Sequence, residues 1–149
     1  MFNEIAKVLQ HPRCMNCHVS GKSPKQGDDR RVHMPPVERG ADGRGAGLTC
    51  KTCHSDKNGP VAPGAPDWHL APVEMAWEGL SVAELCRAVT NTAKNGGRSA
   101  QALAKHMSED PIVLWGWNPG GGRKPIPMAK EEFAKLAHAW ADAGAACPQ

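Results

Sequence analysis

Apolar side chains recur at helical spacing near both ends of the 149-residue chain. Phe2, Ile5 and Leu9 share one face, and Pro12 follows them, which predicts a short N-terminal helix over residues 2–10. The same periodicity predicts three helices in the C-terminal part. We place them from residue 82 to the Gly96-Gly97 pair, over 99–109 and over 130–143.

Two short motifs of one pattern lie between these predicted helices. Cys14-Met15-Asn16-Cys17-His18 and Cys50-Lys51-Thr52-Cys53-His54 both read C-x-x-C-H, the attachment signature of c-type haem. Cysteines at this spacing lie on one turn of chain, so their sulfurs can reach both vinyl groups of one porphyrin. The adjacent His18 or His54 then becomes the proximal iron ligand. The sequence therefore predicts two covalently bound haem c groups.

Cysteine pairs of this kind also occur in zinc ribbons and in thioredoxin-like redox sites. Here 32 residues separate the two pairs, which is outside the usual ribbon spacing, and a histidine follows each second cysteine directly. No βαβ pattern surrounds either motif. The haem interpretation is therefore favoured over both alternatives.

An internal repeat extends both motifs. An offset of 36 residues superimposes the two motifs and aligns His33 with His69 within a shared H-x-x-P-V-E tail. We expect His33 and His69 to be the distal iron ligands, which would give low-spin, bis-histidine haems. The alternative is that both are exposed loop histidines. The sequence does not decide whether each serves the haem of its own repeat or the other one.

Four other side chains compete for the distal positions and rank below these two histidines. Met34 and Met75 are close to them in sequence, and Met128 lies in a proline-rich loop before the last predicted helix. His106 belongs to a predicted helix. For each methionine, packing in the core is the better interpretation.

Composition and charge narrow the class of protein. The chain has 16 glycines, 13 prolines, two phenylalanines and no tyrosine, which predicts loops that wrap a cofactor instead of forming sheets. A formal charge of +3 at pH 7 gives no indication of nucleic-acid binding. No stretch is apolar enough to span a membrane, and residues 1–4 lack signal-peptide features, so we expect a soluble mature segment.

Two cysteines remain once four are assigned to the motifs, namely Cys86 and Cys147. Haem is attached to such motifs outside the bacterial cytoplasm, which predicts a periplasmic or extracellular protein where disulfides persist. A Cys86–Cys147 bond would join one predicted helix to the end of the last. Two separate thiols are the alternative.

With its motifs at 14–18 and 50–54, the chain resembles the small di-haem cytochromes c. The resemblance implies a mainly α fold, thioether attachment at the motif cysteines, and proximal ligands at His18 and His54. Single-haem members have one motif per pair of terminal helices, whereas here two motifs share one pair. We expect one loop-rich domain, with a haem 1 segment at 1–46, a haem 2 segment at 47–80 and a helical cover at 81–149.

The function that these features favour is electron transfer. Two haems would relay single electrons between redox partners such as a periplasmic dehydrogenase, an oxidase or another cytochrome. The chain also resembles cytochrome subunits that serve bacterial molybdenum hydroxylases, which adds such an enzyme to the expected partners. The alternatives are a di-haem enzyme of the peroxidase or reductase type and a haem-based sensor, both of which need an open iron position.

Overall fold

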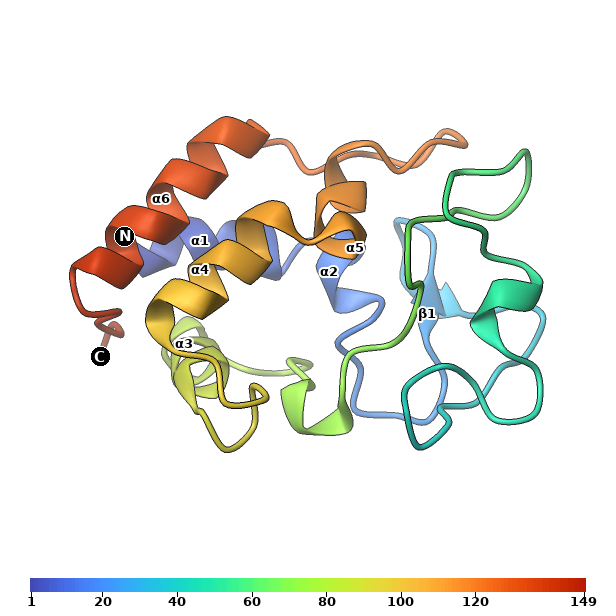
Figure 1. Ribbon diagram of the computed structural model, residues 1–149, viewed down its shortest axis with the longest axis horizontal. Coiled ribbons are helices and arrows are strands. Elements are labelled where there is room, and N and C mark those ends of the chain that lie inside the picture. Colours follow the sequence, from blue (N-terminus) through green and yellow to red (C-terminus); the bar gives the residue numbers. More distant parts are fainter.

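The computed structural model describes residues 1–149 and is mainly helical and rich in loops (Figure 1). The α-helices are α1 (Phe2–Leu9), α2 (Pro12–Met15), α3 (Val82–Thr90), α4 (Ala100–Glu109), α5 (Pro111–Leu114) and α6 (Lys130–Asp142). The short turns of 3₁₀-helix are η1 (Cys50–Thr52), η2 (Val73–Met75) and η3 (Trp115–Trp117). Strands β1 (Lys25–Gln26) and β2 (Arg31–Val32) form one antiparallel hairpin, in which Lys25 pairs with Val32.

Two of the longer helices, α3 and α4, begin at serine caps that the sequence supplies. Ser81 caps α3 in a full capping box with Glu84. Ser99 caps α4, since its hydroxyl accepts a hydrogen bond from the Ala102 N–H at 3.2 Å. Helices α1, α4 and α6 agree with the predicted ranges to within one residue at each end.

Helix α3 is shorter than predicted, because it ends at Thr90 and does not reach Gly96-Gly97. Asn91 leaves the helical conformation with φ −74° and ψ 104°, and its side-chain oxygen accepts a hydrogen bond from the Ala93 N–H at 3.0 Å. Asparagine competes with a helix in this way because its side chain bonds to nearby backbone. Residues 91–97 therefore form a turn.

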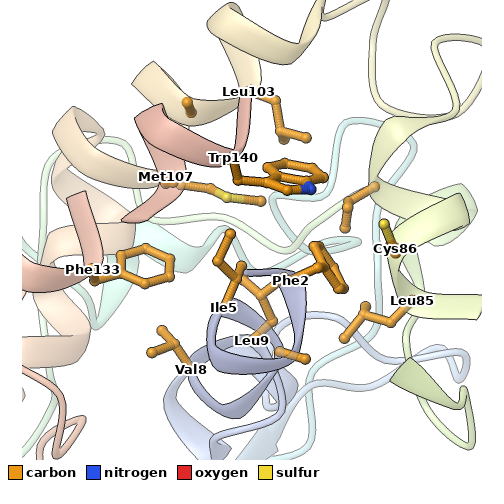
Figure 2. Close-up of a cluster of buried hydrophobic side chains, with 14 of the residues drawn as sticks. Phe2, Ile5, Val8, Leu9, Leu85, Cys86, Leu103, Met107, Phe133 and Trp140 are labelled. Atoms are coloured by element: carbon orange, nitrogen blue, oxygen red, sulfur yellow. The ribbon is translucent and has the colours of Figure 1, made fainter. Parts of the chain in front are cut away.

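The hydrophobic core lies among α1, α3, α4 and α6 (Figure 2). The Phe2 ring lies 5.1 Å from Trp140, and Ile5 and Leu85 are completely buried. The connected core contains 19 buried residues, and none of them comes from residues 16–74. The helical part therefore holds the continuous core, and the loop region lies outside it.

A disulfide joins Cys86 on α3 to Cys147 beyond α6, as expected from the sequence. The two Cα atoms are 5.5 Å apart, and Cys86 is fully buried. The Trp140 indole also fixes the C-terminal tail, because its N–H donates to the Ala146 carbonyl at 3.0 Å.

The loop region, residues 16–74, lies beside the helical part, with the α2 and α5 helices at the junction (Figure 1). Polar contacts tie the two parts together. Asn58 accepts a hydrogen bond from the Trp115 indole at 2.9 Å, and Glu78 binds Arg30 at 2.7 Å. None of the helices combines the length and the apolar character needed to cross a membrane.

Candidate functional site

The first motif lies on α2 and the turn that follows it. The N–H groups of Cys17 and His18 both donate to the Cys14 carbonyl, at 3.1 and 3.2 Å, which brings both cysteines and the histidine onto one turn. The His18 Nδ1 lies 2.7 Å from the Met75 carbonyl oxygen. Because a carbonyl only accepts, Nδ1 carries the hydrogen and Nε2 is left free to bind a metal. The His18 ring also stacks on Trp77, with centroids 3.3 Å apart.

The second motif repeats this local geometry around η1. The N–H groups of Cys53 and His54 donate to the Cys50 carbonyl at 3.2 and 2.9 Å. The His54 Nδ1 donates to the Pro63 carbonyl at 2.6 Å, so its Nε2 is likewise left free. The His54 ring stacks on Trp68, with centroids 4.7 Å apart and planes 6° from parallel. Each motif thus presents two cysteines and one oriented imidazole.

Each motif lines its own cavity. Cavity 1, of about 630 Å³, is lined by Cys14, Cys17 and His18, and cavity 2, of about 510 Å³, by Cys50, Cys53 and His54. Both volumes lie within the range of roughly 300–1,000 Å³ that is usual for cofactor sites. Both cavities also draw residues from all three expected segments, 1–46, 47–80 and 81–149. Four residues line both cavities and form a shared wall: Arg13, Cys17, His69 and Leu70.

His33 lies in cavity 2, beside the histidine of the other repeat. Its ring centroid is 6.0 Å from that of His54, and its Nδ1 donates to the Pro35 carbonyl at 2.9 Å. With metal–nitrogen bonds of about 2.0–2.1 Å, as in zinc–imidazole sites, rings on opposite sides of one metal ion have centroids roughly 6 Å apart. The observed centroid separation would allow His33 and His54 to hold one metal ion between them.

Two histidines besides His18 line cavity 1. His69 stands in the shared wall, with its Nδ1 donating to the Asp67 carbonyl. His106, on α4, has its Nδ1 3.1 Å from an Asp110 carboxylate oxygen. Both therefore keep Nε2 free, and the cavity offers one more imidazole than a haem has axial positions.

A common hydrogen-bonding pattern separates the histidines of the cavities from the others. In each cavity-lining histidine an oxygen acceptor binds Nδ1 and leaves Nε2 free. This holds for His18, His33, His54, His69 and His106. The other two histidines differ, since His11 accepts the Arg13 N–H at its Nδ1 and His138 contacts Ser108 through Nε2. Metal-binding histidines commonly show the first pattern, because the second hydrogen bond fixes the tautomer and the ring.

The three methionines singled out from the sequence lie in different surroundings. Met34 lines cavity 2 but is 63% exposed. Met75 lines cavity 1 and is buried in the core, and its carbonyl holds His18. Met128 lines neither cavity, and its carbonyl accepts a hydrogen bond from the Trp117 indole at 2.7 Å.

Burial keeps the three motif side chains that line cavity 1 neutral near pH 7. Burial, with a smaller effect from Cys17, raises the pKa of Cys14 to about 12. Burial, followed by the charge of Cys50, raises the pKa of Cys17 to about 11. Burial lowers the pKa of His18 to about 4. Neutral imidazole is the form that binds a metal, so the site holds its histidine in that form.

The donor set suits haem better than a bare metal ion. No group of three or more histidine, cysteine or acidic side chains is arranged to hold a metal ion. A structural zinc ion takes four protein ligands, more than the two cysteines and one histidine that either motif supplies. A haem iron needs at most two protein ligands, because the porphyrin supplies the other four.

Comparisons with known proteins leave the family unassigned. No protein-family model matches the chain, and neither the curated proteins nor the solved structures give a significant match. The motifs and the geometry of the two cavities are therefore the evidence on function.

Sequence reasoning missed the tryptophans that stack on His18 and His54. Trp77 follows η2 and Trp68 directly precedes His69, so the two stacks come from positions that the 36-residue repeat does not relate. The only signal in the sequence is the adjacency of Trp68 to a predicted ligand.

Proposed function

We propose that this chain is a di-haem c-type cytochrome that transfers single electrons. Cys14 and Cys17 would attach one haem c in cavity 1, and Cys50 and Cys53 the other in cavity 2. The iron supplies the redox chemistry, while the chain fixes the cofactors, excludes water and tunes their potentials. The observation that carries the proposal is the set of five cavity-lining histidines that all keep Nε2 free, two of them within C-x-x-C-H motifs.

The axial ligands follow from the positions of these histidines. His18 and His54 are the proximal ligands. The 6.0 Å separation of the His33 and His54 rings supports His33 as distal ligand in cavity 2, so the histidine of the first repeat serves the haem of the second. In cavity 1 the distal candidates are His69 and His106.

A distal histidine in each cavity favours a carrier over an enzyme or a sensor. Peroxidase, reductase and sensor chemistry all need an iron position that is open to a small molecule. With two histidines available for each iron, that position is filled. The shared wall also supports exchange of electrons between the two sites, since the cavities adjoin at Cys17 and His69.

The disulfide and the attachment motifs together support a periplasmic or other extracytoplasmic location. The partners would then be redox proteins of that compartment, such as a dehydrogenase, an oxidase, another cytochrome or a molybdenum hydroxylase.

Spectra of the wild type and of a His33 variant test both the presence of two haems and the assignment of His33 as a distal ligand. The protein is produced with a haem-attachment system, and its mass, visible spectrum and electron paramagnetic resonance spectrum are measured. We expect a mass increment of two haems and two low-spin irons. In His33→Ala one of the two low-spin signals should become high-spin, while the exposed, cavity-remote His138→Ala should leave both unchanged. Absence of the mass increment would refute the proposed function, whereas an unchanged spectrum in His33→Ala would refute only the ligand assignment.

A further inference from the structure

Arg13 is the one lysine or arginine that lines both cavities. We propose that Arg13 is a buried cation that raises the reduction potentials of both haems together, a role that rests on the proposed function. Other cations face a single cavity. Arg39 lines cavity 1, and Arg123 lines cavity 2.

The guanidinium of Arg13 is enclosed by protein. Its side chain is 1% exposed, and it binds Asp28 at 2.5 Å and the Gly27 carbonyl at 3.0 Å. The Nε atom is buried and has no hydrogen-bond partner. An arginine remains charged in proteins, so the shared wall contains a fixed positive charge.

The counter-charge does not cancel this field. Asp28 is 39% exposed, so water screens its carboxylate far more than it screens the guanidinium. Charges in a low-dielectric interior act over longer distances than charges in water. The Asp28 carboxylate therefore offsets the charge of Arg13 only in part at the shared wall.

Packed groups connect Arg13 to both sites. Along the chain it directly precedes Cys14, the first attachment residue. Across the wall its guanidinium lies 5.8 Å from the centre of the Trp115 ring. Trp115 packs edge-on against Trp68 at 4.9 Å, and Trp68 stacks on His54. Arg13 thus lies next to Cys14, and the rings of Trp115 and Trp68 connect it to His54.

A nearby positive charge favours the form of the iron that has gained an electron, because that form is less positive. Removing the charge should lower both midpoint potentials. Removing the counter-charge should do the opposite and raise both. Opposite shifts in midpoint potential in the two variants would identify an electrostatic effect, because a general loss of structure would not depend on the sign of the charge removed.

The test is a redox titration of the haem-loaded protein, fitted to two one-electron steps. In Arg13→Met we expect the ratio of reduced to oxidised haem at a fixed potential to fall at least three-fold at both steps. A three-fold change in this ratio corresponds to a shift of about 28 mV in midpoint potential, since a ten-fold change corresponds to about 59 mV for one electron. Asp28→Asn, which keeps Arg13 in place, should raise both potentials. Arg87→Met, which removes an exposed arginine of α3 outside both cavities, should change neither.

Each outcome decides the proposal. If Arg13→Met lowers only one potential, or neither, Arg13 does not act on both haems. If Arg13→Met fails to fold, Asp28→Asn decides alone, and unchanged or lowered potentials in that variant overturn the proposal. Because every variant is first shown to contain two haems, such a failure is distinct from failure of the proposed function.

Discussion

Removal of the Cys86–Cys147 disulfide should lower the stability of the protein by about 4 kcal/mol. The bond joins residues 61 apart in sequence. Closing a loop of that length restricts the unfolded chain by an entropy that is worth about 4 kcal/mol at 25 °C. Helices α4, α5 and α6 all lie within this loop, so the unfolded helical part gains freedom when the bond is absent.

The measurement is urea unfolding of the haem-loaded protein, followed by circular dichroism, for wild type and Cys86→Ala/Cys147→Ala. With a denaturant slope of about 2 kcal/mol/M, the midpoint should fall by about 2 M. Cys147→Ala alone serves as the control. It breaks the same bond but leaves the buried Cys86 packed in the core, so it should lose nearly as much stability as the double variant.

Two results would contradict this reasoning. A loss below about 1 kcal/mol in both variants would mean that the unfolded chain is already restricted without the bond. A large loss in the double variant with little loss in Cys147→Ala would show that packing of Cys86, and not loop closure, provides the stability.

Two further substitutions probe the loop region. Glu78 accepts hydrogen bonds from the Ser20 N–H and hydroxyl and pairs with Arg30; burial raises its pKa, but these contacts outweigh burial and lower it below its ordinary value of 4.5. The charged Glu78 carboxylate therefore stabilises the fold above pH 4.5, and this stabilisation is lost as the pH falls through the lowered pKa. Glu78→Gln should lower the free energy of unfolding by urea by about 1.5–3 kcal/mol at pH 7 and by progressively less below pH 4.5. A loss that stays constant with pH would contradict this prediction. In Gly64→Ala the new Cβ would collide with the backbone carbonyl oxygens of Ser55 and Lys57, beside the Pro63 carbonyl that holds His54. This variant should broaden or lose one low-spin signal, while Gly21→Ala, where nothing lies within 4 Å, should match the wild-type spectrum.

The helices could be predicted because their signals are local. Serine caps and the apolar stripe of α6 depend on neighbouring residues only, and these helices begin within a residue of the expected positions. The predicted end of α3 was wrong because two sequence signals compete there. The glycine pair suggested a stop at residue 96, whereas Asn91 ends the helix earlier through its own side chain.

The geometry of the cavities depends on contacts between distant residues and could not be read from the sequence. The repeat brought attention to His33 and His69, but their surroundings are not equivalent. His33 binds the carbonyl of Pro35, two residues after it, whereas His69 binds that of Asp67, two residues before it. The pairing of His33 with His54, and the approach of His106 on α4 to cavity 1, arise only when the loops fold back onto the helices.

The uneven distribution of the core bears on how the molecule matures. Residues 16–74 contribute nothing to the connected apolar core, which comes mostly from helices α1, α3, α4 and α6. We therefore expect those helices to assemble early and to act as a scaffold. Under the proposed function, residues 16–74 would stay open to the attachment machinery, and insertion of the porphyrins would complete the folding of this segment, so that biogenesis and structure formation would be one process there.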